Sequence, residues 1–352
     1  MGEGGSQPAT LADVARASGV SRQTVSNVIN APHRVRPQTR ARVQEAIAAL
    51  GYEPNRLAQA LQAQASRLIG YRIDPMQPDS LGTIHDRFIH ALAEAVQAAD
   101  HQLLVFAATD QEDELRTYER LYRTGAVDGF VLYGIDHHDP RPAALVGFGA
   151  PAVAFGRTDE PTEQSWVDID NAAGTAAAVD HLVARGHRRI GFLGWPEGSG
   201  TGDRRAAGWY QAMRRHGLLP GSADLDLRGQ DSILNGAQLG LALLDRPQPP
   251  TAIVTVSDTL AVGVLQAARG RGLTVGRDLA VVGFDDTPAA RVLELSSVSQ
   301  PIESAAVAIV RCLLPRLPAG RGAEPGTEET PGRLLAPHLV VRASSAWSPV
   351  PG

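Results

Sequence analysis

The chain has 352 residues, more than a single hydrophobic core usually supports, and 43% of them are hydrophobic, so we expect at least two packed domains. Its formal net charge of −5, taken alone, argues against a nucleic-acid-binding protein, and its single cysteine excludes an intramolecular disulfide and a zinc site built from several cysteines. No apolar run reaches the roughly 18 residues of a membrane span, so no membrane contact is expected.

The N-terminal segment, residues 1–9, lacks the basic and apolar regions of a secretory signal, so we expect a disordered tail on a cytoplasmic protein. Charge is distributed unevenly along the chain. Residues 1–66 hold seven arginines against four acidic residues, so this part carries +3 and the remainder carries −8. A basic head on an acidic body is the asymmetry expected when only the head binds DNA.

The segment from Thr10 to Asn30, TLADVARASGVSRQTVSNVIN, has apolar residues at helical spacing on both sides of Gly19. This spacing predicts two short amphipathic helices joined by a tight turn. Thr10 and Asp13 match a capping box for the first helix, and Ser21 is placed to cap the second. The second helix presents side chains that can reach base edges and phosphates, namely Arg22, Gln23, Thr24, Ser26 and Asn27. We interpret the segment as a DNA-binding helix-turn-helix, although an ordinary helical hairpin would show the same amphipathic pattern.

A third helix completes the predicted head. Pro37 suits its first position, and we expect it to end near Leu50 because Gly51 follows as a C′ residue. The small core of the head is predicted to consist of five apolar residues, Val14, Val25, Val28, Val43 and Ile47. We place this DNA-binding domain at residues 10–53.

Residues 54–66 contain the pattern of one more short helix, which Asn55 can cap and which carries Leu57, Ala58 and Leu61 on one face. A helix of this length is marginal by itself in water, so it needs a partner, such as a twin helix on DNA. The pattern alone favours a plain linker helix.

From Leu68 onward, strand patterns alternate with helix patterns. We predict strands at Leu68–Arg72, Gln102–Phe106, Gly129–Leu132 and Pro151–Phe155 and, in a second series, at Arg189–Gly194, Ala252–Val256 and Ala280–Gly283. We predict helices near 83–99, 112–124 and 141–147 and then near 171–185, 203–216, 233–244 and 258–271. Such alternation implies parallel sheets covered on both faces, and two series predict two doubly wound lobes with a cleft between them.

The end of the chain is predicted to contain a loop and a final strand. Residues 317–333 are rich in Gly, Pro and Glu and predict an exposed loop, Leu335–Arg342 predicts the last strand, and residues 346–352 form a tail. We divide the two-lobe domain, 67–345, into an N-lobe of about 67–165 and 302–330 and a C-lobe of about 166–301 and 331–345.

Motifs run through the whole chain in a fixed order. The head contains TLADVARASGVSRQTVSNVIN, TRARVQEAIAALGYEPN and NRLAQAL. The body contains HLVARGHRRIGFLG, DRRAAGWYQAM, PTAIVTVSDTLAVGVLQAARGRGL and DLAVVGFDDTPAA, followed by SSVSQP and LVVRASS. From about residue 10 to 345 this set resembles the lactose-repressor (LacI) family of bacterial transcription regulators. The resemblance implies an all-α helix-turn-helix head and an α/β two-lobe effector domain like that of periplasmic binding proteins, with two doubly wound parallel sheets.

The resemblance also implies a homodimer whose two heads bind successive major grooves of a pseudo-palindromic, double-stranded operator. The base-reading positions of the family match Arg22, Gln23 and Asn27. Positions that hold the DNA backbone match Ser21, Thr24, Ser26, Arg34, Thr39 and Asn55. Arg36 departs from the small capping residue that family members more often carry, which weakens that cap and adds a candidate phosphate contact.

The short helix near residue 60 gains a role from the same resemblance. In the family, two hinge helices meet in the minor groove, where a leucine from each wedges open the central base step. Leu61 matches that leucine, and Ala58 faces the floor of the groove. A hinge that folds only on DNA makes operator affinity switchable.

The implied effector is a sugar or sugar derivative bound in the cleft at the C-terminal ends of the strands. Arg205 matches the effector-contact arginine of the family, and its guanidinium suits a pair of hydroxyls. Asp285, the first acid of GFDD, matches the cleft carboxylate. Ser257 occupies a contact position where other members carry Asn, and its shorter reach leaves the identity of the ligand open. Asp74 is a further candidate from the N-lobe.

Other conspicuous residues have structural interpretations. We predict that Asp258 is a helix N-cap, that Cys312 is a buried structural thiol, and that His137 and His138 face solvent. Trp195 is a weaker candidate for stacking on the face of a sugar.

The chain contains no pattern typical of an enzyme. The loop GWPEGSGTGD lacks the residues of a phosphate-binding loop and the spacing of a dinucleotide fingerprint, and neither G-x-S-x-G nor H-E-x-x-H occurs. We therefore expect no catalytic activity, no cofactor and no metal. A solute-binding protein would share the cleft, but it would need a secretion signal and would have no use for the head.

These observations predict a cytoplasmic, nucleoid-associated transcription regulator. Its partners are operator DNA, a small-molecule effector and a second copy of the chain. The prediction favours a repressor that leaves its operator when a sugar closes the lobes, which requires the effector to bind the two lobe arrangements with different affinity. A corepressor-dependent repressor, an activator and a phosphoprotein corepressor stay open, as does a tetramer, although no C-terminal heptad run is visible.

Overall fold

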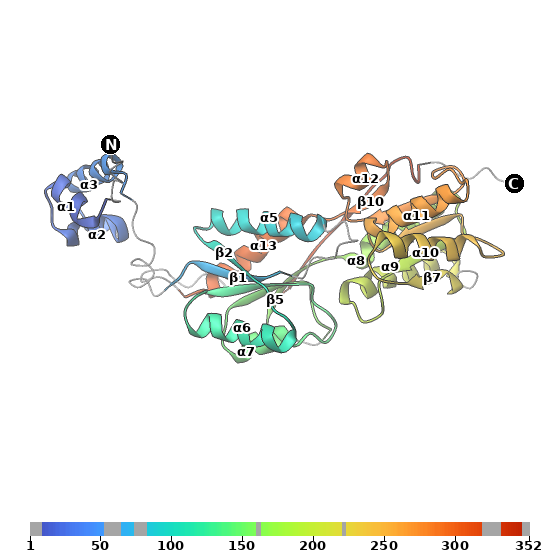
Figure 1. The fold of residues 1–352 in the computed structure, drawn as a ribbon, viewed down its shortest axis with the longest axis horizontal. Coiled ribbons are helices and arrows are strands. Elements are labelled where there is room, and N and C mark those ends of the chain that lie inside the picture. Colours follow the sequence, from blue (N-terminus) through green and yellow to red (C-terminus); the bar gives the residue numbers. More distant parts are fainter. Residues whose placement is uncertain are drawn as a thin grey trace, which may run out of the picture. The chain divides into compact units, whose positions relative to one another are not determined.

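The computed structural model describes residues 9–52, 65–73, 83–159, 163–219, 223–318 and 332–346. The chain divides into two compact units, Met1–Ser66 and Arg67–Gly352. Each unit is described by itself. Figure 1 labels their helices and strands.

The N-terminal unit, called the head below, contains α1 (Leu11–Ser18), α2 (Arg22–Asn30), a short 3₁₀ turn (Pro32–Arg34) and α3 (Pro37–Leu50). The predicted capping box is confirmed: the Asp13 N–H donates to Thr10 Oγ1 (3.4 Å), and the Thr10 N–H donates to Asp13 Oδ2 (3.0 Å). Gly19 ends α1 in the left-handed conformation, with φ of 62°, a backbone state that glycine adopts without steric cost. The turn between α1 and α2 is therefore built as predicted.

The core of the head is small and apolar, as predicted. Val14, Val25 and Val43 are fully buried, Val28 is nearly so, and Ile47 packs against them. Gly51 caps α3 with φ of 58°. The side chain of Arg36 makes no capping hydrogen bond at the start of α3, so the predicted weakness of that cap is confirmed. The predicted hinge residues Asn55, Ala58 and Leu61 lie outside the described residues.

The larger unit holds two six-stranded sheets. The N-lobe sheet has the order β11-β5-β4-β3-β1-β2 and is parallel throughout. Its strands are β1 (Leu68–Arg72), β2 (Gln102–Phe106), β3 (Gly129–Tyr133), β4 (Ala152–Phe155), β5 (Ser165–Ile169) and β11 (Gly332–Leu335). Helices α5 (Thr83–Ala98) and α13 (Ile302–Leu313) cover one face, and α6 (Gln111–Arg123) and α7 (Pro140–Gly147) cover the other (Figure 1).

The C-lobe sheet has the order β12-β10-β9-β8-β6-β7, and β12 is its antiparallel member. Its strands are β6 (Ile190–Gly194), β7 (Asp226–Arg228), β8 (Ala252–Thr255), β9 (Ala280–Phe284), β10 (Ser296–Ser299) and β12 (His338–Val340). Its helices are α8 (Asn171–Ala184), α9 (Gly200–Arg215), α10 (Ile233–Leu244), α11 (Asp258–Gly270) and α12 (Pro288–Val292). Two 3₁₀ turns, Ala223–Leu225 and Leu314–Arg316, complete the described elements of this unit.

The lobe boundaries differ from the predicted ones. Strand β5 ends at Ile169 and pairs within the N-lobe sheet. The chain therefore first passes from the N-lobe to the C-lobe beyond residue 165, where the sequence had placed the boundary. The single strand predicted at Leu335–Arg342 is wrong, because the chain forms β11 in one sheet and β12 in the other. Pro337 lies between them and has no N–H for a ladder hydrogen bond, so the strand breaks where the chain changes lobe. Cys312 is buried, as predicted.

Candidate functional site

Helix α2 carries the candidate base-reading residues of the head. Arg22 and Gln23 are exposed, Asn27 is half-buried, and Gln23 Nε2 donates to Asn27 Oδ1 at 3.1 Å. Ser21 starts the helix, because the Thr24 N–H donates to Ser21 Oγ at 3.1 Å. The outer surface of α2 therefore offers a charged fork and two amides, which are the groups that pair with guanine and adenine edges.

The candidate backbone contacts lie around that helix. Arg34 is exposed on the 3₁₀ turn, and Ser26 and Thr39 are half-buried on α2 and α3. Six arginines and two acidic residues lie in the described part of the head, 9–52. This excess of positive charge favours contact with phosphates.

A cavity of about 140 Å³ lies between the two lobes; we call it the inner cavity. Its walls come from the carboxyl ends of β3, β4 and β5 in the N-lobe and from the first turns of α8 and α9 and the ends of β6, β9 and β10 in the C-lobe. Its polar lining consists of Tyr133, Asp136, Asp168, Asn171, Ser199, Thr201, Arg205, Asp285 and Gln300. Open α/β sheets bind ligands at this edge.

Arg205 projects from α9 into this cavity and is held on three sides. Its Nε donates to Asn171 Oδ1 at 2.8 Å, its Nη1 donates to the carbonyl oxygen of Val256 at 2.5 Å, and Nη1 lies 3.4 Å from Asp285 Oδ1. Its guanidinium carbon lies 3.7 Å from the ring centroid of Phe284, a cation–π distance. The structure therefore brings together two residues that the sequence placed eighty positions apart.

Asp285 lies in a strained backbone position directly after β9, with φ of 110°. Gln300 Nε2 donates to its Oδ1 at 2.6 Å. Burial, reinforced by the nearby Asp258 and Asp231, raises the pKa of Asp285 to about 8, although Arg205 opposes the shift. Burial therefore favours the neutral form of this carboxyl.

We expect Asp285→Asn to raise the stability of the unliganded protein more at pH 8 than at pH 5. In the folded chain the pKa of Asp285 lies above its ordinary value of 3.8. Between about pH 4 and pH 8, the folded chain therefore keeps a proton on Asp285 that the unfolded chain has released. The free energy of unfolding therefore falls as pH rises through this range. The side chain of the Asp285→Asn variant does not titrate, so the variant is not destabilised in this way. Urea denaturation at the two pH values measures the effect. The exposed control Asp100→Asn is expected to change neither midpoint, and equal shifts of Asp285→Asn at both pH values would contradict the prediction.

Ser257 is placed differently from the sequence-based expectation of an effector contact. It is buried, it does not line the inner cavity, and its hydroxyl donates to Asp231. It also caps α11, because the Leu260 N–H donates to Ser257 Oγ at 3.2 Å. Ser257, rather than Asp258, is therefore the N-cap, and the prediction for Asp258 is wrong.

Asp258 instead connects the loop after β9 to strand β10. The Thr287 N–H donates to its Oδ2 at 2.7 Å, and Ser297 Oγ donates to its Oδ1 at 2.6 Å. This fully buried carboxylate thereby supports the loop that carries Asp285. Asp74, the N-lobe candidate from the sequence, lies outside the described residues.

Sequence reasoning missed several residues that line the inner cavity. Asp168 is the second-last residue of β5, and Gln300 directly follows β10; neither strand was predicted. Tyr133 and Phe155 supply aromatic walls, with ring centroids 5.8 Å apart. Trp195, the weaker stacking candidate, also lines the cavity. A polar residue at the carboxyl end of a strand is the signal that identifies Asp168 once β5 is known.

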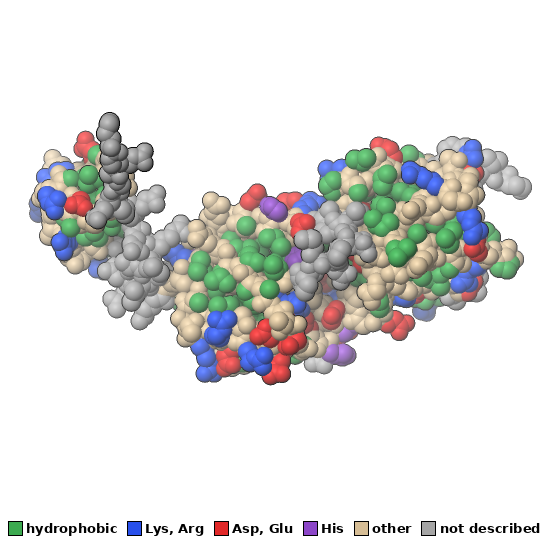
Figure 2. All heavy atoms as spheres, viewed as in Figure 1, with side chains coloured by type: hydrophobic (Ala, Val, Ile, Leu, Met, Phe, Trp, Pro, Cys, Tyr) green, Lys and Arg blue, Asp and Glu red, His purple; other side chains and the backbone are tan. Residues whose placement is uncertain are grey.

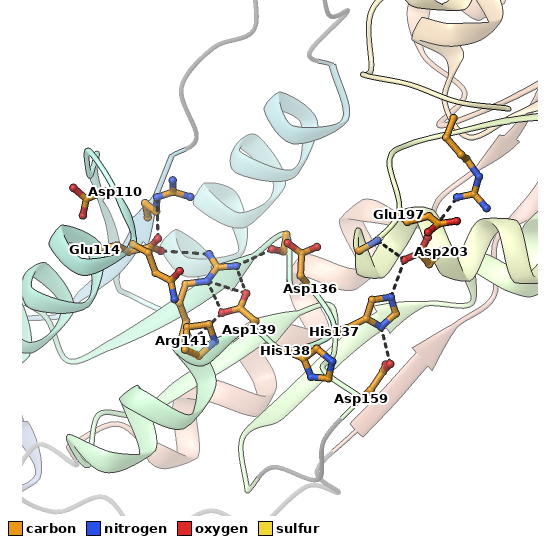
Figure 3. A pocket seen from close by; sticks show the side chains of 16 residues that line it. Asp110, Glu114, Asp136, His137, His138, Asp139, Arg141, Asp159, Glu197 and Asp203 are labelled. Atoms are coloured by element: carbon orange, nitrogen blue, oxygen red, sulfur yellow. Dashed lines mark hydrogen bonds and ion pairs between the residues drawn. The ribbon is translucent and has the colours of Figure 1, made fainter. Parts of the chain in front are cut away.

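A second cavity, of about 940 Å³, adjoins the inner one at Gly134 and Asp136; we call it the outer cavity (Figure 3). Seven acidic residues line it, namely Asp110, Glu114, Asp136, Asp139, Asp159, Glu197 and Asp203. Three arginines, Arg72, Arg141 and Arg228, accompany them, so negative charge dominates its walls when the histidines are neutral.

The start of α9 also holds the two lobes together. The Gly200 N–H donates to Asp136 Oδ1 at 3.0 Å. His137 lies between two carboxylates, 2.6 Å from Asp159 Oδ2 and 3.1 Å from Asp203 Oδ2 (Figure 3). The prediction that His137 faces solvent is therefore wrong. The same helix, α9, carries Arg205.

No group of His, Cys, Asp and Glu side chains in the described ranges has the arrangement of a metal site. In the same part of the chain, no helix is long and apolar enough to cross a membrane.

Comparisons with known proteins agree over both units. Residues 10–55 match the family described as bacterial regulatory proteins, lacI family, and residues 179–345 match a periplasmic binding protein-like domain. The HTH-type transcriptional regulator CelR of Thermobifida fusca is 33% identical over 349 residues, covering 95% of this chain and 98% of CelR.

Two solved structures are similar over 96% of this chain and 99% of their own. A CelR–cellobiose complex is 30% identical, with a TM-score of 0.69. A lac repressor dimer bound to operator and the anti-inducer ONPF is 29% identical, with a TM-score of 0.78. The similarity thus extends through the head and both lobes.

Proposed function

Because the chain belongs to the LacI family of bacterial transcriptional regulators, we propose that it is a repressor that leaves a pseudo-palindromic operator when a sugar or sugar derivative binds the inner cavity. It is a transcriptional regulator with an N-terminal DNA-binding domain and not an enzyme.

The buried group of Arg205, Asp285 and Gln300 is the observation that supports an effector in the inner cavity. It places a cation, a carboxyl and an amide within hydrogen-bond reach of one another at the carboxyl edge of the sheets. Such groups pair with the hydroxyls of a polyol, and Tyr133 and Trp195 offer ring faces for its carbon skeleton. The relative CelR has been solved with cellobiose, which is consistent with this chemistry.

Exposed hydrophobic side chains support a homodimer. Val292 on α12 and Leu234 on α10 are 84% and 62% exposed. Figure 2 shows hydrophobic side chains gathered over α5 and α13 of the N-lobe and over helices of the C-lobe. A surface of this kind favours contact with a second copy, as in the lac repressor dimer. A dimer would place two α2 helices on two half-sites of an operator, in the cytoplasm at the nucleoid.

Selection of binding sites from a random duplex library tests the DNA-binding part of the proposal. We expect the full chain to recover an inverted repeat, and a neutral sugar from a panel to weaken binding to that duplex by about tenfold or more. Recovery of no repeat would contradict operator binding. A sugar that tightens binding would replace induction by a corepressor mechanism.

Arg22→Ala is expected to weaken binding to the selected duplex by about 10- to 100-fold, because a bidentate contact with one base contributes about 1–3 kcal/mol. Fluorescence anisotropy with labelled duplex measures the loss. The matched control is Arg42→Ala, which removes the same charge from an exposed position on α3. If both variants lost the same affinity for the duplex, Arg22 would contribute only its charge and not a specific contact with a base.

A further inference from the structure

Asp168 stands out among the residues of the inner cavity because one of its oxygens is left without a hydrogen bond. Its side chain is 4% exposed and lines the cavity from the N-lobe. Oδ1 accepts from the Ile169 N–H at 2.8 Å, whereas Oδ2 accepts no hydrogen bond from the described residues. Oδ2 forms an ion pair with Arg157 Nε at 3.3 Å. A buried carboxylate oxygen without a hydrogen bond costs free energy that a ligand hydroxyl would recover.

Arg205 supplies a single positive charge to the inner cavity. It is the only basic residue among the described residues that line the inner cavity, and its Nε and Nη1 already donate to Asn171 and to the Val256 carbonyl. The same lining contains three carboxyl groups, those of Asp136, Asp168 and Asp285. An anion would meet one cation, Arg205, beside the carboxylates of Asp136 and Asp168, which repel it.

The approach to the inner cavity carries the same sign of charge. The outer cavity, which adjoins it at Gly134 and Asp136, has seven acidic residues against three arginines. Ion pairs such as Arg141 with Asp139 cancel one charge of each sign, so an excess of four acidic residues is left in its walls. Walls of one sign focus the electrostatic field and lower the local concentration of anions.

The volume of the inner cavity limits the ligand further. It is about 140 Å³, compared with roughly 300–1,000 Å³ for pockets that hold drug-sized molecules. This space suits a single sugar ring or a comparable polyol between the two lobes.

We propose that the effector is a neutral or amino-substituted polyhydroxylated molecule, with one ring in the inner cavity, and that a hydroxyl of this ring donates to Asp168 Oδ2. The proposal rests on the proposed function and adds to it the charge class of the ligand and the residue that selects it. It excludes sugar phosphates and sugar acids as effectors. Asp168 from the N-lobe and Arg205 with Asp285 from the C-lobe then contact the same ligand, so binding joins the lobes.

Isothermal titration of the full chain tests the charge class. The neutral probes are D-glucose, D-galactose, D-mannose and cellobiose, and each hexose is paired with its 6-phosphate, its uronic acid and its 2-amino derivative. We expect a binder among the neutral or amino probes and about 100-fold weaker binding of the matched phosphate and uronate. An anion that binds as tightly as its neutral parent overturns the proposal, as does the absence of any neutral or amino binder.

Asp168→Asn tests the selecting residue. The amide oxygen can still accept from the Ile169 N–H, so the local fold is retained, but the charged acceptor is lost. We expect affinity for the neutral binder to fall by about tenfold or more and its advantage over the matched uronate to shrink. The control Asp180→Asn, an exposed carboxylate on α8, should change neither value. If the affinities for the neutral sugar and for its uronate fell by the same factor, Asp168 would have a merely structural role, and the proposal would be overturned.

The two proposals fail separately. A chain that selects an inverted repeat yet binds the phosphate or uronate remains a regulator and loses the charge class inferred here. A chain that selects no repeat contradicts the proposed function, whichever sugar it binds.

Discussion

Arg205→Ala is expected to abolish effector binding while leaving operator binding intact. The side chain is buried, donates to Asn171 and to the Val256 carbonyl, and lies 3.4 Å from Asp285. Its removal takes away the cation of the inner cavity and leaves Asp285 buried without it. A guanidinium that contacts a pair of ligand hydroxyls makes two charged hydrogen bonds of about 1.5–3 kcal/mol each, so their loss should raise the dissociation constant by more than about 100-fold.

Titration calorimetry with whichever sugar of the panel binds the unsubstituted chain measures this loss, and anisotropy measures the response of the DNA complex. The variant should hold its operator at effector concentrations that release the unsubstituted chain. Arg215→Ala is the matched control, because it removes an arginine from the same helix where the side chain is exposed and pairs with Asp180. A normal titration by Arg205→Ala would remove this residue from the effector site.

Gly263→Ala is expected to destabilise the larger unit severely, because α10 and α11 pack with their backbones in close contact at this glycine. A Cβ atom there would lie 2.3 Å from the Ile233 carbonyl oxygen and 2.4 Å from the Ala237 nitrogen. Backbone atoms cannot rotate away as the end of a side chain can, so the helices must move apart. Overpacking of this kind costs about 1–3 kcal/mol or more.

Urea denaturation followed by circular dichroism measures the effect. The same helix supplies the control: Gly270, its last residue, has no atom within 4 Å of the position that a Cβ would take. Gly270→Ala should be neutral or slightly stabilising, because alanine has the higher helix propensity. Equal stability of the two variants would show that the close approach of α10 and α11 is not required.

The local features of the head could be predicted because each depends on residues a few positions apart. The capping box of Thr10 and Asp13, the left-handed turn at Gly19 and the burial of Val14, Val25 and Val43 are all present. Each follows from a side chain that serves its own helix end or its own helix face.

The strands of the two lobes were predicted where their residues are uniformly apolar, as in β1, β3 and β9. Strands with polar residues were missed. Strand β7, Asp226–Arg228, has a charged residue at each end, β5 contains Asp168, and β10 consists of Ser296–Ser299, three serines and one valine. The serines of β10 are buried, and hydrogen bonds such as that from Ser297 Oγ to Asp258 satisfy them. A period-based pattern cannot recognise a buried polar strand, because its partners come from distant segments.

The sequence by itself determined the family, the helix-turn-helix, the two-lobe α/β architecture, and the choice of Arg205 and Asp285 as candidate effector contacts. Only the tertiary structure decided that these two residues meet, that Ser257 turns away to Asp231 and caps α11, and that Asp168 enters the same cavity from the other lobe. The physical reason is that a helix cap or an apolar face is defined within one segment. A cavity between lobes depends on the strand ends that meet where the chain crosses between the lobes. It depends also on the polar atoms that are left there without a hydrogen bond.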